Sequence, residues 1–423
     1  MEFSILADAL GKMESTTKRL ELTQYLVELF EKTPQDVISK IVYLLQGKLR
    51  PDFEGIELGV AEKLAIRAIS KSSGIPIKKI ENEYRKSGDV GHAATKILEQ
   101  KTQTTFIVED ITVERVYETL FKIAKLEGAR SQDMKMKYIS SLLNDANPIE
   151  ASYILKILLG TLRLGIAENT VMDSLAIAFT GDKTNRKKLE KAYNVSSDLG
   201  KVAETIAADG LTGIEKFQIK LFNPIRPMLA ERVKSENEAL EKLGDKFAAE
   251  YKLDGERVQL HLDQDKVILF SRSLENITSY YPDIVEKIPK NIQSDKVILE
   301  AEAVAINEGT GEYLPFQELM HRRRKYKVEK AVSQYPISVN FFDVLYSDGK
   351  SCLDMTYNER RKTLEKIIKE DDFAKNVTMS VVTNQEEIEE FLENSINAGC
   401  EGLMLKMLDK PYQAGSRGNY WLK

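Results

Sequence analysis

The apolar residues in the first half of the chain have the spacing of helices, and strand-type alternation is scarce before about residue 247. Residues 22–30 and 37–45 place aliphatic and aromatic side chains on one face of a helix. Thr33 followed by Pro34 predicts the N-cap and first residue of the second of these helices. Residues 147–150 (Asn-Pro-Ile-Glu) predict another start, in which the glutamate completes a capping box. These patterns predict an all-helical domain.

The pattern changes at Pro224 and Pro227, two prolines that stop a helix and favour an extended crossing segment. We place a domain boundary here, between a helical domain of residues 1–221 and a second domain of residues 222–423. Beyond it, strands alternate with helices, so the second domain is predicted to be α+β. The predicted strands are residues 249–252, 258–263, 267–270, 296–306, 337–345 and 402–406, and the predicted helices are residues 233–243, 357–368 and 385–398.

The first two of these strands flank a short stretch, Leu253-Asp254-Gly255, that predicts a tight turn. The expected structure is a hairpin with Lys252 just before the turn and Arg257 just after it. Only about one lysine in two thousand is neutral near pH 7. A lysine therefore acts as a nucleophile only where burial or neighbouring cations lower its pKa. Lys252 is a candidate nucleophile if the rest of the chain supplies that environment.

Composition sets the broad class of the protein. A length of 423 residues with 42% hydrophobic and 30% charged residues is typical of a globular protein of two or three domains. No apolar run approaches the roughly 18 residues of a membrane span, and the N-terminus lacks a signal-peptide pattern. The two cysteines, Cys352 and Cys400, are far apart, which indicates neither a disulfide framework nor a zinc site. We expect a cytoplasmic protein without membrane association.

Net charge does not predict a nucleic-acid partner, because its formal value is -5. A local basic surface would be needed instead. Three loops between predicted helices, residues 47–51, 87–92 and 162–168, combine glycines with charged residues. Each alone is most often an ordinary connection, but free N–H groups at helix starts suit phosphates. The candidate DNA-binding residues in these loops are Lys48, Arg50, Arg163 and Gly165.

Cations and acids also recur along the second domain. Glu300 and Glu302 lie two residues apart on a predicted strand, so they share a face. Phe342, beside Asp343, offers a flat apolar surface for a base. Singly, such residues are usually surface ion pairs or core aromatics, but together they suit a nucleoside triphosphate, whose phosphates need cations and whose metal or ribose needs an acid. The cations are Arg257, Arg272, Lys406 and Lys423.

Residues 250–257, Glu-Tyr-Lys-Leu-Asp-Gly-Glu-Arg, resemble the KxDGxR element of the covalent nucleotidyltransferases, which include ATP-dependent DNA ligases, RNA ligases and mRNA capping enzymes. Five later elements follow in that superfamily's order: Ser271-Arg272, Glu302, Phe342-Asp343, residues 401–406 and residues 421–423. In the first half, residues 88–91, 162–165 and 224–230 resemble the DNA-binding domain of replicative DNA ligases of the archaeal and eukaryotic type. RNA ligases and capping enzymes lack such a domain, so an archaeal DNA ligase is the best match.

This resemblance implies a multidomain fold, with an all-α N-terminal DNA-binding domain followed by an α+β adenylation domain with antiparallel sheets. It implies ATP and Mg²⁺ as cofactors and nicked double-stranded DNA as the partner, in replication, repair and recombination. AMP would be carried on a lysine, passed to the 5′-phosphate of a nick and displaced by the 3′-hydroxyl. We expect a monomer near the nucleoid, and a sliding clamp is a further partner that a replicative role would bring.

The resemblance also implies individual roles. Lys252 is the nucleophile. Glu250 accepts a hydrogen bond from the adenine amino group, Phe342 stacks on the base, and Met404 stands where valine or isoleucine is more usual. Contacts to the ribose, phosphates or metal are implied for Arg257, Arg272, Glu302, Glu401, Lys406, Arg417 and Lys423, with Glu302 and Glu401 as the metal acids.

Family members continue past the last lysine element into an oligonucleotide-binding (OB) barrel. The present chain ends at Lys423, so we expect the OB-fold domain to be absent from it. Two alternatives stay open at this point. One is an RNA ligase or capping-type nucleotidyltransferase, and the other is a nick-binding fragment that does not adenylate itself efficiently.

Overall fold

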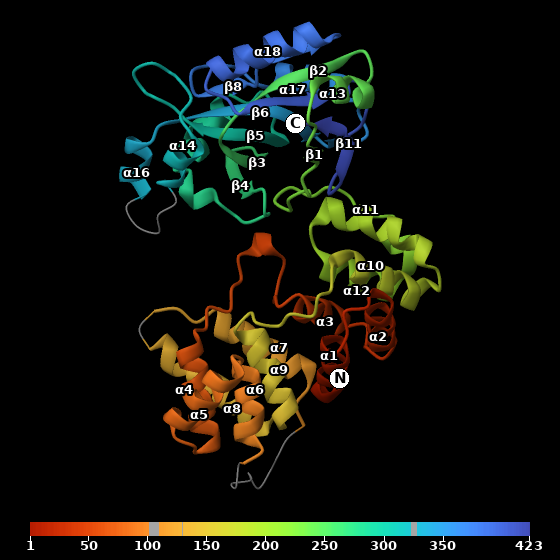
Figure 1. Ribbon diagram of the computed structural model, residues 1–423, viewed down its shortest axis with the longest axis vertical. Helices are drawn as coiled ribbons and strands as arrows, with labels where there is room; N and C mark the ends of the chain where they lie inside the picture. The colour runs from red at the N-terminus through yellow and green to blue at the C-terminus, as the bar shows by residue number, and fades with distance from the viewer. Residues whose placement is uncertain (101–109, 129, 323–327) are drawn as a thin grey trace. The chain divides into compact units, whose positions relative to one another are not determined.

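The computed structural model describes residues 1–100, 110–128, 130–322 and 328–423 (Figure 1). These residues form two compact units, Met1–Tyr193 with Asp198–Phe217, and Asn194–Ser197 with Gln218–Lys423. Within the described ranges, no helix is long and apolar enough to cross a membrane.

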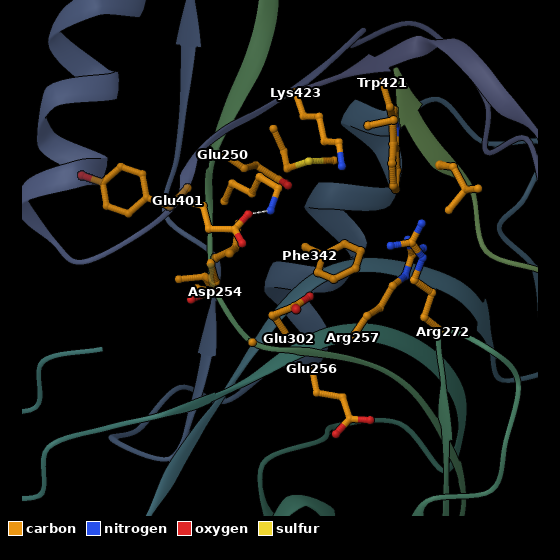
Figure 2. Close-up of a pocket in the computed structure, with 18 of the residues that line it drawn as sticks. Glu250, Asp254, Glu256, Arg257, Arg272, Glu302, Phe342, Glu401, Trp421 and Lys423 are labelled. Atoms are coloured by element: carbon orange, nitrogen blue, oxygen red, sulfur yellow. Dashed lines mark ion pairs between the residues drawn. The ribbon is translucent and has the colours of Figure 1, made fainter. Parts of the chain in front are cut away.

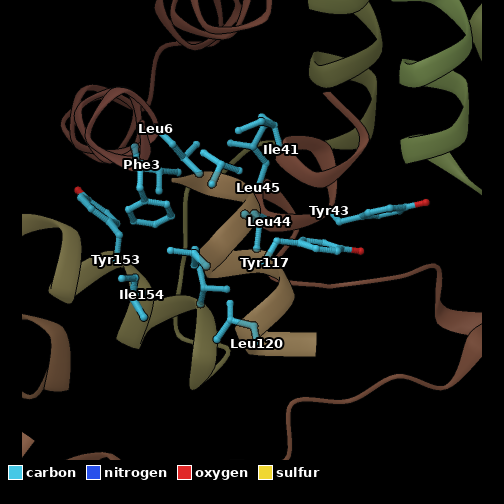
Figure 3. Packing of buried hydrophobic residues seen from close by; sticks show 14 of the residues in the cluster. Phe3, Leu6, Ile41, Tyr43, Leu44, Leu45, Tyr117, Leu120, Tyr153 and Ile154 are labelled. Carbon is cyan, nitrogen blue, oxygen red and sulfur yellow. The ribbon is translucent and has the colours of Figure 1, made fainter. Parts of the chain in front are cut away.

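The first unit is built from helices, which confirms the prediction for the first half of the chain. In chain order the helices of this half are α1 (Phe3–Glu14), α2 (Arg19–Glu31), α3 (Ile38–Leu45), α4 (Glu62–Ser73), α5 (Ile77–Ser87), α6 (Val90–Leu98), α7 (Val113–Ala124), α8 (Ser131–Asp145), α9 (Pro148–Leu158), α10 (Glu168–Thr180), α11 (Arg186–Ser196) and α12 (Leu199–Ile214). Apolar side chains from α1, α3, α7 and α9 meet in its core, where Phe3, Leu120 and Ile154 are fully buried (Figure 3).

The two predicted helix starts have different outcomes. Asn147 caps α9, and its side chain and that of Glu150 form the expected capping box. Thr33 does not cap α3, so this prediction was wrong. Its buried hydroxyl donates to the carbonyl of Leu29 at 2.7 Å, and α3 begins only at Ile38. A threonine that follows a helix can bond back to that helix's last turn, and here this contact replaces the cap.

The second unit holds two sheets. One has five strands in the order β1-β11-β10-β2-β9, and the other joins β4-β3-β5-β6-β7, with β8 beside β6. All pairs are antiparallel except β1 with β11 and β6 with β8. The strands are β1 (Leu229–Glu231), β2 (Phe247–Lys252), β3 (Glu256–Asp263), β4 (Lys266–Ser271), β5 (Lys296–Ala305), β6 (Ile337–Ser347), β7 (Lys350–Ser351), β8 (Ala374–Asn376), β9 (Met379–Val382), β10 (Gly402–Lys406) and β11 (Arg417–Leu422).

Helices cover both sheets and complete the α+β architecture (Figure 1). Two of them, α13 and α18, pack on the five-stranded sheet around a small apolar core. The other sheet is covered by α14 and α17 over a larger core. The helices of this unit are α13 (Glu236–Leu243), α14 (Pro282–Lys287), α15 (Phe316–Met320), α16 (Val328–Gln334), α17 (Tyr357–Ile367) and α18 (Gln385–Asn397).

The predicted hairpin around Lys252 does not form. Strand β2 pairs with β9 and β10, whereas β3 pairs with β4 and β5, so the two strands belong to different sheets. The turn at residues 253–255 therefore carries the chain from one sheet to the other. The alternation of apolar and polar residues around an Asp-Gly turn is the same in a hairpin and in a turn that joins two sheets, because this local pattern does not determine which strands pair. The correction places Lys252 at the junction of the sheets.

The proline-containing segment before β1 is tied to the second sheet by a buried histidine. The backbone N–H of Phe222 donates to His261 Nδ1 at 2.9 Å, and His261 Nε2 lies 3.0 Å from Gln259 Oε1. Since a backbone N–H can only donate, Nδ1 accepts and the ring proton is on Nε2. Gln259 also exchanges hydrogen bonds of 2.7 and 2.9 Å with the backbone of Ile225. The neutral imidazole is thus part of the attachment.

This arrangement predicts a pH-dependent stability. Burial lowers the pKa of His261 to about 3, whereas the unfolded value is 6.5. Below pH 6.5 the His261 imidazole binds a proton in the unfolded chain but not in the folded chain, so the free energy of unfolding falls as pH falls. Between pH 6.5 and 5 the loss is about 1.7 kcal/mol, because the slope rises from half of about 1.4 kcal/mol per pH unit at pH 6.5 to nearly all of it at pH 5. Urea unfolding followed by the fluorescence of Trp421, the single tryptophan, measures it.

The His261→Asn variant is the control for this prediction. Asparagine offers an acceptor near the position of Nδ1 but does not titrate. We expect it to lose stability at pH 7 yet to lose about 1.7 kcal/mol less than the wild type between pH 6.5 and 5. Equal pH slopes in the two proteins would assign the acid sensitivity to other groups.

Candidate active site

A cavity of about 770 Å³ lies between the two sheets of the second unit (Figure 2). This is within the usual range of small-molecule sites. The structure brings to its wall every nucleotide and metal residue that the sequence predicted. They are Glu250, Lys252, Arg257, Arg272, Glu302, Phe342, Glu401, Met404, Lys406, Arg417 and Lys423.

Lys252 is the last residue of β2, opposite Gly402 of β10. Its side chain is 25% exposed and forms an ion pair with Glu401 (Figure 2). Burial lowers the pKa of the Lys252 amine, and the cations Lys423 and Arg272 lower it further, while Glu302 acts in the opposite direction. This is the environment that increases the neutral, nucleophilic fraction of a lysine.

Glu302 faces the cavity from β5, paired in register with Arg257 of β3. Burial raises the pKa of the Glu302 carboxyl to about 8, opposed by the positive charges of Arg257 and Lys252. Its neighbour Glu300 is fully buried. The two acids share a face of β5, as their spacing predicted, but only Glu302 lines the cavity.

Glu250 and Lys406 form a buried pair in the wall of the cavity. Their side chains are 2% and 1% exposed, and Glu250 Oε2 lies 2.5 Å from Lys406 Nζ. The ammonium also lies over the rings of Phe342, Tyr357 and Trp421, at 4.9, 5.0 and 4.3 Å from their centroids. Burial lowers the pKa of Lys406 although Glu250 opposes the shift. The phosphate contact expected of Lys406 stays a prediction, since here its amine is held by Glu250.

Arg257 is held by groups to which the family resemblance assigns no role. Its Nη2 lies 2.6 Å from Glu300 Oε2, and its Nη1 donates to the carbonyl of Met228 at 2.9 Å. Glu300 also accepts from the Tyr412 hydroxyl at 3.0 Å. The guanidinium stacks on Phe342, 5.3 Å from its centroid. Tyr412 lies outside every quoted motif, and only the folded chain brings it here.

Comparisons with known proteins identify the family. Residues 227–423 match the family described as ATP dependent DNA ligase domain, and residues 2–176 match DNA ligase N terminus. The DNA ligases of Nitrosopumilus maritimus (strain SCM1) and Cenarchaeum symbiosum (strain A) are 80% and 68% identical over all 423 residues of this chain, which span 72% of each relative. The chain belongs to the ATP-dependent DNA ligases. Its fold resembles that of the solved structure described as Pmar-Lig_PreS3, with a TM-score of 0.55 at 16% identity over 99% of this chain and 77% of that chain.

Membership of this ligase family decides between the alternatives left open by the sequence. Both family matches name DNA ligases, and the two archaeal relatives do so over the full length of this chain. An RNA ligase or capping enzyme is therefore not favoured, nor is a nick-binding fragment that does not adenylate itself efficiently. The family description also establishes that the ligase uses ATP.

Five acidic residues line the cavity: Glu250, Asp254, Glu256, Glu302 and Glu401. Across residues 1–100, 110–128, 130–322 and 328–423, no three His, Cys, Asp or Glu side chains are grouped so as to hold a metal ion. Glu302 and Glu401 both line the cavity, and the side chain of Glu401 is 42% exposed. Mg²⁺ is commonly held by one or two carboxylates together with substrate phosphates, and these two acids fit that pattern.

The candidate DNA-binding residues lie on loops of the first unit. Lys48 pairs with Asp52 at 2.6 Å, and Arg50 lies 3.8 Å from Glu54 and stacks on Phe121. In the loop between α9 and α10, Arg163 is exposed, and Gly165 has a φ of +64°, a left-handed conformation that favours glycine. Of the three cations, the two in the first loop thus have acidic partners within the chain.

Proposed function

We propose that this ligase seals nicks in duplex DNA through an AMP adduct on Lys252. The observation that carries the proposal is the position of Lys252 in a nucleotide-sized cavity, with a lowered pKa and with cations and acids around it. The Lys252 amine attacks the α-phosphorus of ATP. A nitrogen–phosphorus bond forms, the bond to the β-phosphate oxygen breaks, and pyrophosphate leaves. Glu401, in contact with the amine, can take the released proton.

Two transfers complete the reaction. The 5′-phosphate of the nick attacks the adduct, so AMP moves to the DNA and Lys252 is regenerated. The neighbouring 3′-hydroxyl then attacks the 5′-phosphorus, the phosphodiester forms and AMP leaves. In each step a phosphoryl group changes partners, and the surrounding charges stabilise its oxygens.

The remaining cavity residues divide by the part of ATP that each would meet. Phe342 stacks on the adenine and Glu250 accepts from its amino group. The exposed cations Arg272, Arg417 and Lys423 neutralise phosphate oxygens, while Arg257 is placed by Glu300 and meets the ribose or phosphate. Met404 packs beside the base.

For Mg²⁺ we propose Glu302 and Glu401 as the protein ligands, because both carboxylates line the cavity, Glu401 is paired with Lys252, and the charge of Glu302 acts on the Lys252 amine. Bound there with the phosphates, the ion would neutralise their negative charge. Its ligands from the protein would be oxygens only, which is what Mg²⁺ prefers.

The direct test is intact mass spectrometry of the ligase after incubation with ATP and Mg²⁺, followed by peptide mapping. We expect a single added AMP, located on Lys252. GTP should leave the mass unchanged. An AMP adduct on any other residue, or equal labelling by GTP, would contradict the proposal. A parallel assay with nicked DNA and nicked RNA checks the acceptor.

A second prediction concerns the DNA surface. Arg163→Ala should weaken binding to nicked DNA whatever its sequence, and should reduce the slope of log affinity against log salt by about 0.9, the contribution of one phosphate contact. Lys48→Ala and Arg50→Ala should have smaller effects, because phosphate must compete with Asp52 and Glu54 for these cations. Fluorescence anisotropy over a salt series measures all three.

The exposed Lys32, after α2, provides a matched charge-removal control that lies outside the three loops. Lys32→Ala should bind with the affinity and salt slope of the wild type. Wild-type slopes for Arg163→Ala, Lys48→Ala and Arg50→Ala alike would show that the DNA surface lies elsewhere on the first unit.

A further inference from the structure

The Glu250 carboxylate is fixed by three side chains that are themselves buried. Its Oε1 accepts a hydrogen bond from the Tyr357 hydroxyl, at 2.5 Å. Its Oε2 meets Lys406 Nζ, and Arg361 Nη1 lies 3.7 Å from Oε1. Tyr357, Arg361 and Lys406 are 1%, 8% and 1% exposed. Such contacts leave the carboxylate little freedom to rotate.

Two of these contacts come from one helix. Tyr357 and Arg361 are four residues apart on α17, so they lie on the same face. This helix packs on β6 of the second sheet, whereas Glu250 belongs to β2 of the first. A helix attached to one sheet thus orients an acid that belongs to the other. Neither α17 residue lines the nucleotide cavity, and both act on it through Glu250.

We propose that Tyr357 and Arg361 are positioning residues that aim the Glu250 carboxylate at the 6-amino group of adenine and so set the preference for ATP. The proposal rests on the proposed function, in which Glu250 meets that amino group. Each carboxylate oxygen has two acceptor directions. With Oε1 bonded to Tyr357 and Oε2 to Lys406, one direction on each oxygen is left for a ligand. A base with a carbonyl at position 6 would place acceptor against acceptor, which is costly in a buried site.

The tyrosine hydroxyl is suited to this task. Burial, and next the charge of Glu250, raise the pKa of Tyr357 well above its ordinary value, so the hydroxyl remains a donor. Without it, the Lys406 ammonium, which has three donors, can draw both carboxylate oxygens towards itself and turn them from the base.

Arg361 is held in place by other bonds. Its Nε donates to Glu365 at 2.8 Å and its Nη2 to the carbonyl of Val377 at 3.0 Å. Nη1 is buried, and no hydrogen-bond partner for it occurs among the described residues. The guanidinium is therefore fixed from its far side, and the charge of Nη1 acts on Glu250 across 3.7 Å.

The test compares ATP with purine riboside triphosphate, whose base lacks the 6-amino group. Initial rates of AMP or purine-nucleotide transfer to Lys252 are measured over a range of each nucleotide. For Tyr357→Phe we expect the KM for ATP to rise about tenfold, with kcat changed less than about twofold and the KM for the analogue unchanged. The preference for ATP then falls about tenfold. Arg361→Gln should behave likewise, and Arg361→Lys, which keeps the charge, should restore most of the preference.

Tyr346→Phe is the matched control, because Tyr346 lies on β6 outside the cavity wall. It should keep the wild-type preference. An equal loss for both nucleotides in Tyr357→Phe and Arg361→Gln would overturn the proposal, since it would mean a general structural effect. So would an unchanged KM for ATP in both. A wild-type ligase that forms no adduct would refute the proposed function itself. Adduct formation by the wild type is therefore measured before any variant is compared.

Discussion

Replacing Lys252 by alanine is expected to abolish AMP transfer to the ligase, with a loss of more than about 10⁴-fold in rate, because it removes the attacking atom and not merely a contact. The neighbouring cations cannot substitute for it. The guanidinium of Arg257 forms an ion pair with Glu300, and the buried amine of Lys406 forms one with Glu250, so neither is available as a nucleophile. Intact mass spectrometry after incubation with ATP gives the result directly, and nick sealing from ATP should be lost with it.

Lys252→Arg separates charge from nucleophilicity. Arginine keeps a cation that Glu401 can pair with, but its guanidinium does not lose its proton in proteins. We therefore expect ATP binding without adduct formation. Lys246→Ala removes an exposed lysine just before β2 and should react as the wild type does. Labelling of Lys252→Ala at the wild-type rate would eliminate Lys252 as the nucleophile.

The sequence pattern predicted the elements of the second unit well. The strand expected at residues 402–406 is β10 (Gly402–Lys406), and that expected at residues 296–306 is β5 (Lys296–Ala305). These predictions succeeded because alternation and β-branched content are local properties. The family was predictable for a similar reason. Each motif is a short stretch of sequence that can be recognised without the fold, and the motifs follow in the superfamily's order.

Pairing between distant strands was not predictable in this way. Strand β2 finds β9 and β10 more than a hundred residues later, and nothing in residues 247–263 distinguishes this from a hairpin. The groups that hold the acids were missed for a related reason. Tyr357 is 107 residues from Glu250, and Tyr412 is 112 residues from Glu300. Such contacts follow from the packing of α17 and of the segment before β11, and no spacing along the chain encodes them.

The turn at residues 253–255 carries the chain from one sheet to the other, and we expect Gly255→Ala in this turn to have the second large effect. A Cβ at Gly255 would lie 2.4 Å from the carbonyl oxygen of Ala303 and 2.9 Å from Glu302 Cγ and Val304 Cγ2. The nearest obstacle is backbone of β5, so the strand or the turn must move. We expect a loss of about 3 kcal/mol in the free energy of unfolding, measured by urea unfolding with Trp421 fluorescence.

The effect of Gly255→Ala on AMP transfer should exceed its effect on stability. The turn carries Lys252 on one side, and the displaced strand carries Glu302, so their relative position changes. A misplacement near 1 Å costs about 10²-fold in rate, and we expect at least that loss by adduct mass spectrometry. Gly309→Ala is the control, because its Cβ would have nothing nearer than Asn307 Oδ1 at 3.4 Å. If Gly255→Ala matched this control in stability and rate, Lys252 would not be positioned by the close approach of the turn at residues 253–255 to β5.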